Sequence, residues 1–141
     1  MPLATRLTKT ESPASSAPTG DIAAKITRLP PQNMEAEQAL LGSLMLDKDA
    51  IIKIENTITA EDFYKNRHVD IFRAMVDLYR RQEPIDLLSL TNKLEERRQL
   101  ETIGGSTYLA TLVNAVPSAA NVLYYAKIVQ KKATLRRLIG T

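Results

Sequence analysis

The chain has 141 residues, of which 44% are hydrophobic, 25% charged and 5% aromatic, a balance typical of one soluble globular domain. A nucleotide-driven motor needs upwards of about 200 residues and a glycine-rich phosphate loop, and because the chain has neither, ATP hydrolysis within it is excluded. With no cysteine, one histidine and no apolar run near the roughly 20 residues that cross a bilayer, we expect a soluble intracellular protein without a catalytic residue, cofactor or metal of its own.

The net charge of +3 is spread unevenly along the chain. Residues 31–118 hold ten basic and fourteen acidic residues, whereas residues 119–141 hold five basic residues and no acidic one. A pI near 9.2 would indicate nucleic-acid binding if the basic residues formed one patch. Because they are divided between the two ends of the chain, a small all-helical nucleic-acid-binding module is the alternative interpretation, not the first.

Residues 1–29 are predicted to form a disordered tail. Ten of the first twenty residues are Pro, Ser or Thr, and the few apolar ones follow neither a helical nor a strand period. Such a segment cannot bury enough apolar surface to offset the entropy that it loses on ordering. A flexible tail is favoured over a transit peptide, because Glu11 and two prolines interrupt any amphipathic helix.

Residues 30–117 are predicted to form a globular body of helices separated by helix breakers. Pro30 and Pro31 favour an extended backbone, and Asn33 can cap a helix whose first turn holds Glu35. Gly42 lies inside this helix, and because glycine there costs about 1 kcal/mol against alanine, we expect a neighbouring helix to approach closely. The inner face is predicted to hold Leu40, Leu41, Leu44 and Met45.

Two short elements and one long helix follow. A second helix is predicted from Asp47 to Ile54, and Thr59 with Asp62 resembles a capping box that starts a brief turn. Residues 66–82 have the clearest helical period, and we expect them to be the central core helix, with His68 as a structural or exposed histidine beside its inner face. That inner face is predicted to hold Val69, Phe72, Met75, Val76 and Tyr79.

Two more helices are predicted before Pro117. Asp86 caps the first of them, and the charged run 95–98 forms its solvated side. The string 104–107 (GGST) lacks the lysine of a phosphate loop and follows no strand, so we interpret it as a turn in which Ser106 caps the helix that carries Tyr108. The inner side chains of the first helix are predicted to be Leu87, Leu90 and Leu94.

Residues 118–141 are predicted to form one projecting helix. At 100° per residue, one apolar sector runs almost to the chain end and holds Val122, Tyr125, Ile128, Val129, Leu135 and Ile139. A helix of about 20 residues spans about 30 Å, which exceeds what a core of this size offers. The excess apolar surface therefore needs a partner, either a second hairpin helix or another protomer.

Five strings of the chain carry a family resemblance. They are residues 30–42 (PPQNMEAEQALLG), 61–64 (EDFY), 84–87 (PIDL), Gly104-Gly105 followed by Tyr108-Leu109, and 117–121 (PSAAN). In this order they resemble the N-terminal domain of the bacterial replicative DNA helicase, the DnaB family. The resemblance spans residues 29–141, and Leu135 to Ile139 is similar to the segment where that family's helical hairpin turns toward its linker.

This resemblance implies an all-α fold, a compact bundle of about six helices that ends in the first part of a projecting helical hairpin. It implies a collar domain that pairs through its hairpins in a hexameric ring and docks the C-terminal helicase-binding domain of primase during DNA replication. The parent would be a cytoplasmic 5′–3′ DNA helicase whose separate motor domain uses ATP and Mg. It would contact DNA only through the hexamer and no membrane, with a helicase loader as a further candidate partner.

The resemblance also implies two sets of partner residues. Primase docking is assigned to Glu35, Tyr108, Arg136 and Ile139. For Tyr108, core packing is a nearly equal alternative, and for Ile139 the alternative is pairing with a second hairpin helix or another protomer. Contacts between subunits or within the helical hairpin are assigned to Tyr125, Ile128, Val129, Leu135 and Leu138. A third interpretation, an enzyme with a carboxylate site, is disfavoured because the adjacent acidic pairs at 61–62 and 95–96 point in different directions on a helix.

Overall fold

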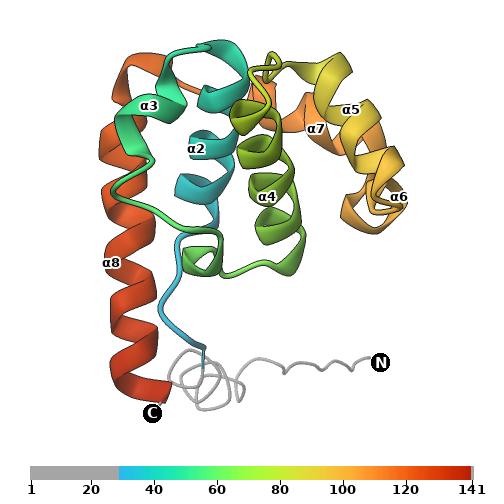
Figure 1. Ribbon diagram of the computed structural model, residues 1–141. Coiled ribbons are helices and arrows are strands. Elements are labelled where there is room, and N and C mark those ends of the chain that lie inside the picture. The colour runs from blue at the N-terminus through green and yellow to red at the C-terminus, as the bar shows by residue number, and fades with distance from the viewer. Residues whose placement is uncertain (1–28, 141) are drawn as a thin grey trace, which may run out of the picture. The chain divides into compact units, whose positions relative to one another are not determined.

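A computed structural model describes residues 29–140 of the chain (Figure 1). The chain divides into two units, Met1–Pro30 and Pro31–Thr141, and all the elements below belong to the second unit. Its described residues form seven α-helices and two 3-10 turns without a strand, so the predicted all-α fold is confirmed. The predicted tail lies outside the described residues except for Leu29.

The helices follow one another through short connections. They are α2 (Met34–Leu46), α3 (Ala50–Ile54), α4 (Asn66–Arg80), α5 (Leu87–Glu96), α6 (Leu100–Ile103), α7 (Gly105–Asn114) and α8 (Val122–Gly140). The 3-10 turns are η2 (Ala60–Asp62), which precedes α4, and η3 (Ala119–Asn121), which precedes α8. The sequence did not predict α6, because a helix of one turn is too short to display a period.

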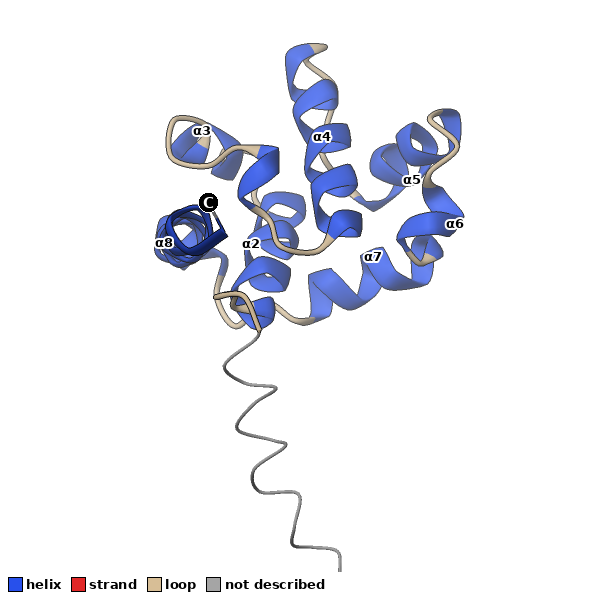
Figure 2. Cartoon of the chain, turned by 90° about the horizontal axis from the view of Figure 1, so that it is seen from below, coloured by secondary structure: helices blue, strands red, loops and turns tan. Residues whose placement is uncertain are grey.

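Helix α2 is the centre of this unit. It contacts α8, α7, α4 and α3, and Figures 1 and 2 show it between α8 on one side and α4 on the other. Every residue from Ala39 to Met45 is buried, including the four predicted inner side chains. The expectation that residues 66–82 form the central helix is therefore wrong. Small side chains explain the difference, since Ala39, Gly42 and Ser43 let neighbours approach α2 on the sides that its leucines leave open.

Gly42 shows how closely α7 approaches α2. A Cβ atom built on this glycine would lie 2.1 Å from the carbonyl oxygen of Leu112 and 2.4 Å from Cγ2 of Val116. The nearer atom belongs to the backbone, which cannot rotate away as a side chain can. The predicted close approach of a helix at Gly42 is confirmed.

The predicted helix starts are mostly confirmed. The side chain of Asn33 accepts a hydrogen bond from the amide of Ala36, and Asp86 accepts one from the amide of Ser89. Thr59 and Asp62 form the capping box of η2. The prediction that Ser106 caps α7 is wrong, because Gly104, in the left-handed conformation (φ 111°), both ends α6 and is the N-cap of α7, two residues before Ser106.

The buried face of α4 differs from the predicted one by a small rotation. Val69, Val76 and Tyr79 are only partly buried, whereas Phe72 and Met75 are buried as predicted. The rotation follows from contacts that the sequence of α4 does not contain, since α2, α5, α6 and η2 all pack against this helix. The residues that complete the buried face are His68, Ile71, Ala74 and Leu78. In α5 the predicted inner residue Leu87 is 40% exposed, and Ile85 is buried in its place.

Helix α8 packs along α2 and α3 for its first three turns and then loses its apolar contacts. Its buried residues are Val122, Tyr125, Ala126, Val129 and Ala133. Beyond them, Leu138 and Ile139 are 72% and 71% exposed. Figure 1 shows that α8 extends past the N-terminal end of α2. Among the described residues, no helix combines the length and apolarity that a membrane span requires.

Candidate partner-docking surface

The four residues assigned to primase docking come from three helices. Glu35 is exposed in the first turn of α2, and Tyr108 is partly buried in the first turn of α7. Arg136 and Ile139 are one turn apart near the end of α8, the first partly buried and the second exposed. Hydrogen bonds to neighbouring residues hold Tyr108 and Arg136 in place.

A buried polar chain links Tyr108 to α2. The Tyr108 hydroxyl lies 2.6 Å from Nε2 of His68, and Nδ1 of the same ring lies 2.7 Å from Oε1 of Glu37. The other carboxylate oxygen of Glu37 accepts a hydrogen bond of 2.6 Å from the amide of Tyr64. The side chains of His68 and Glu37 are 0% and 1% exposed, so three helices and the turn before α4 meet at one satisfied polar cluster.

The polar network continues from Tyr108 to a second residue of α2. Oε2 of Glu37 accepts the N–H of Tyr64, and Oε1 of Glu37 faces Nδ1 of His68. The Tyr108 hydroxyl lies beside Nε2 of His68 and also accepts a hydrogen bond of 3.4 Å from Nε2 of Gln38. Every polar group has a partner, and the histidine is sealed from any substrate. These contacts position Tyr108, and His68, predicted to be a structural or exposed histidine, is found buried and hydrogen-bonded.

The ring of Tyr108 is held from two further sides. The guanidinium carbon of Arg67 lies 4.1 Å from the ring centroid, a cation–π contact. A Cβ atom on Gly104 would lie 2.8 Å from Cβ of Tyr108, so only glycine leaves room for the tyrosine beside this left-handed turn. Tyr108 thus presents a fixed aromatic side chain at the surface.

Two arginines tie the end of α8 to the rest of the unit. Arg136 donates from Nη1 to the carbonyl of Pro31 at 2.8 Å and from Nη2 to the carbonyl of Asp62 at 2.7 Å. Its guanidinium carbon also lies 5.4 Å from the ring of Tyr64. Arg137 is bonded to the buried carboxylate of Asp62, which also accepts from the amide of Thr59. Arg136 is therefore occupied within the chain, which sequence reasoning did not predict.

These contacts connect the predicted residues. Tyr64 joins the two groups, since its amide reaches the carboxylate of Glu37 and its ring lies beside Arg136. Sequence reasoning missed Glu37, His68 and Asp62 as supports for this surface. The available signal in the sequence was a polar residue on an apolar helix face, which is common in proteins. Only the fold shows that two such residues, Glu37 and His68, contact each other.

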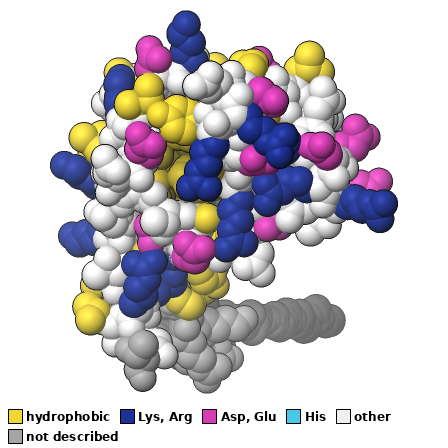
Figure 3. All heavy atoms as spheres, viewed as in Figure 1, with side chains coloured by type: hydrophobic (Ala, Val, Ile, Leu, Met, Phe, Trp, Pro, Cys, Tyr) yellow, Lys and Arg dark blue, Asp and Glu magenta, His cyan; other side chains and the backbone are white. Residues whose placement is uncertain are grey.

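The residues assigned to subunit contacts divide into two groups. Tyr125 and Val129 are 8% and 1% exposed and lie in the chain's own core, so they have almost no surface for a second protomer. Ile128 and Leu135 are partly buried. Leu138 is 72% exposed and, with Ile139, forms the apolar tip of α8, defined here by these two residues. Figure 3 shows apolar side chains at this lower end of the helix.

The acidic pairs of the carboxylate-enzyme interpretation are engaged elsewhere. A hydrogen bond from Arg73 lowers the pKa of Glu61, and one from Lys93 lowers the pKa of Glu96. A general acid at neutral pH needs a raised pKa, so the shifts oppose that role. The described residues hold no cluster of three or more histidine, aspartate or glutamate side chains that could bind a metal.

Comparisons with known proteins bear on the same unit. The family described as "DnaB-like helicase N terminal domain" matches residues 29–131. The chain is 51% identical over 114 residues to the replicative DNA helicase DnaB of Geobacillus stearothermophilus and 48% identical to the replicative DNA helicase DnaC of Bacillus subtilis. In both cases the match covers 81% of this chain and 25% of the relative, so the chain spans about a quarter of the length of these relatives.

Solved structures give the same result. The N-terminal domain of the DnaB helicase from Mycobacterium tuberculosis superposes with a TM-score of 0.78 at 46% identity, covering 79% of this chain and 81% of that one. A DnaB-like replicative helicase, described together with its interactions with primase, matches with a TM-score of 0.69 at 30% identity, covering 77% of this chain and 25% of the other.

Proposed function

The chain belongs to the DnaB-like helicase N-terminal domain family, and on this premise we propose that it is the assembly and docking part of a bacterial replicative DNA helicase. Its tasks are to pair subunits in a hexameric ring and to dock the C-terminal domain of primase. Unwinding, with its ATP and Mg, belongs to a motor domain outside this chain, and DNA is contacted through the hexamer. The protein works in the cytoplasm, and a helicase loader is a further candidate partner.

One observation carries the docking proposal: the apolar tip of α8 faces solvent on a helix end that is held in place. Leu138 and Ile139 are each more than two-thirds exposed, while Arg136 fixes the same turn through two backbone carbonyls. A held apolar side chain loses little entropy on binding, and exposed apolar anchors beside arginine are typical of interface centres. The related helicase described with primase supports primase as the partner.

The other docking residues have different roles in this proposal. Tyr108 contributes a rigid aromatic contact, and exposed Glu35 contributes a carboxylate at the rim. Arg136 acts as a positioning residue, since both of its terminal nitrogens are occupied within the chain. Its contribution to affinity is therefore the placement of the apolar tip of α8.

Titration calorimetry with a primase C-terminal domain tests the docking surface. Ile139→Ala is expected to weaken binding about tenfold, the usual loss for a central apolar anchor. Ile52→Ala on α3 is the matched control, because Ile52 is also an exposed isoleucine (53%) but lies on another helix. The affinity of this variant for primase should stay within about twofold of that of the unchanged chain. Equal affinities of both variants and the unchanged chain would contradict the proposal.

Pairing of subunits is proposed for the outer face of α8. Tyr124 is 64% exposed and Leu138 72%, and they lie about four turns apart on the same side of the helix. Light scattering after size-exclusion chromatography measures the outcome. A concentration-dependent dimer that becomes monomeric in Tyr124→Glu is expected, whereas a monomer at all concentrations would contradict pairing through this segment alone.

A further inference from the structure

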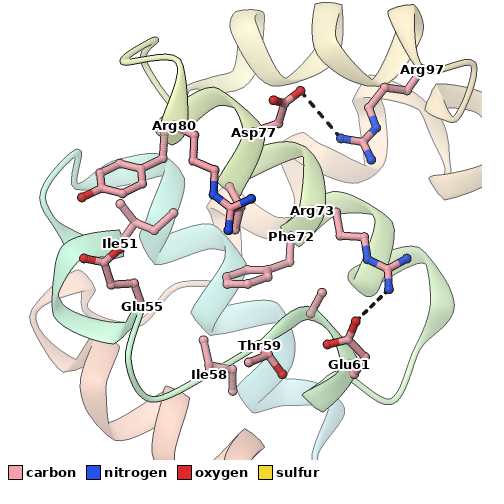
Figure 4. Close-up of a pocket in the computed structure, with 13 residues that line it drawn as sticks. Ile51, Glu55, Ile58, Thr59, Glu61, Phe72, Arg73, Asp77, Arg80 and Arg97 are labelled. Carbon is pink, nitrogen blue, oxygen red and sulfur yellow. Dashed lines mark hydrogen bonds and ion pairs between the residues drawn. The ribbon is translucent and has the colours of Figure 1, made fainter.

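A groove beside α4 is lined by none of the four docking residues described above. It has a volume of about 760 Å³ and lies between α3 and η2 on one wall and α4 on the other (Figure 4). Buried Ile51, Ile58 and Phe72 form its floor, together with partly buried Val76 and Tyr79. This volume falls in the range of ligand and peptide sites in proteins.

The α4 wall of the groove carries more positive than negative charge. Arg73 is paired with Glu61 at 2.9 Å, whereas the ion pair between Arg97 and Asp77 is long, at 3.9 Å. Asp77 is shared with two further cations, Arg81 at 3.2 Å and Lys93 at 3.4 Å. Partial burial disfavours the charge on Asp77, but Arg81 and Lys93 outweigh this and lower its pKa, so one carboxylate serves three cations.

Among the described residues that line the groove, Arg80 is the cation without a hydrogen bond or ion pair. Within the part of the chain that the structure describes, no hydrogen bond or ion pair is found for its guanidinium, in contrast to Arg73 and Arg97. Figure 4 shows the Arg80 side chain reaching over the groove toward Phe72. Lys and Arg side chains also gather across the middle of this face in Figure 3, with apolar side chains visible between them. An unpaired arginine above an apolar floor fits a ligand that joins a carboxylate to an apolar group.

We propose that this groove binds a short acidic peptide segment of a partner protein, placing one or two large apolar side chains on Phe72 and Val76 and a carboxylate on Arg80. A peptide fits better than a nucleic acid because Glu55 lies on the opposite wall and Arg73 is already paired with Glu61, so the groove offers no continuous row of free cations for a series of phosphates. A peptide carries its charges on separate side chains and can place an amide or apolar group there. This partner is independent of primase docking at the apolar tip of α8.

Nuclear magnetic resonance titration of the isotope-labelled 141-residue chain tests the proposal. The probe is a synthetic peptide of about twelve residues that alternates leucine pairs with aspartate pairs, a length that spans such a groove in extended or helical form. Saturable amide shifts are expected at residues lining the groove. A version with lysine in place of every aspartate should bind at least about fivefold more weakly, as expected for loss of a charge-assisted contact.

Variants locate the site. Arg80→Glu should raise the dissociation constant of the acidic peptide at least about fivefold, and Lys127→Glu, the same charge reversal at an exposed position of α8, should change it less than about twofold. Ile139→Ala should leave it unchanged, which separates this site from the docking surface. The proposal is overturned if no saturable shift occurs, if Arg80→Glu has no effect, or if a thymidine oligonucleotide occupies the groove and the acidic peptide does not.

Discussion

The middle of α2 and the last two turns of α8 are held by opposite means. From Ala39 to Met45, α2 is buried on every side by apolar packing, and its buried Ser43 hydroxyl is satisfied within the helix by the carbonyl of Ala39. At the end of α8, polar contacts provide the attachment while the apolar side chains face solvent. The first arrangement stabilises the fold, whereas the second keeps apolar surface available for a partner.

The two regions also differ in how much change they tolerate. At Gly42 the neighbours of α2 leave no room for a Cβ atom, so an added atom there must displace a neighbouring helix. A missing polar partner near α2 would leave a buried group unsatisfied. Around the apolar tip of α8 the neighbour is water, so a truncated side chain leaves no cavity. Four substitutions, taken from the largest expected effect to the smallest, test this contrast.

His68→Leu is expected to cost about 3–5 kcal/mol in the free energy of unfolding, because it leaves the buried carboxylate of Glu37 without its side-chain partner. Guanidinium denaturation followed by circular dichroism measures the change. The double variant Glu37→Leu with His68→Leu should recover part of the loss, since no unpaired carboxylate remains. A cost below about 1 kcal/mol for the single variant would show that the polar chain contributes little.

Gly42→Ala is expected to cost about 2–3 kcal/mol, because its Cβ would overlap the backbone oxygen of Leu112 and force α7 away from α2. Gly140→Ala near the end of α8 is the matched control, since no atom lies within 4 Å of the added Cβ. The control should be neutral or slightly stabilising. Equal melting temperatures of the two variants would disprove the close approach at Gly42.

Asp62→Ala is expected to cost about 1–2 kcal/mol, because it removes both the capping bond to Thr59 and the contact with Arg137. The loss should be local, so amide hydrogen exchange in the last turns of α8 should accelerate more than in α2. Glu61→Ala is the control, and because its ion pair with Arg73 is exposed to solvent, its stability should stay close to that of the unchanged chain. Uniform acceleration in both helices would contradict a local attachment.

Ile139→Ala is expected to change stability by less than about 0.5 kcal/mol, since a 71% exposed side chain buries little surface. Val129→Ala on the same helix, 1% exposed, should cost about 1–2 kcal/mol through the cavity that it leaves. Thermal unfolding of both variants makes the comparison. If Ile139→Ala were as destabilising as Val129→Ala, the apolar tip would be part of the core.

The sequence by itself determined the helical fold and most of its local details. The Asn33 and Asp86 caps, the Thr59–Asp62 capping box, the inner leucines of α2 and the close approach at Gly42 are all correctly predicted. Each of these depends on residues within one turn or on a period repeated along one helix. Such signals survive in a single sequence because the interacting residues are neighbours in the chain.

Only the tertiary structure decided which helix is central, which face of α4 is buried and what supports the candidate surface. In sequence, 31 residues separate Glu37 from His68 and 40 separate His68 from Tyr108. Arg136 contacts Pro31 across a separation of 105 residues. No local pattern selects such partners, because the free energy of a buried polar contact depends on groups brought together by packing. The same reason applies to Arg80, whose lack of a partner is a property of the folded unit and not of its sequence neighbours.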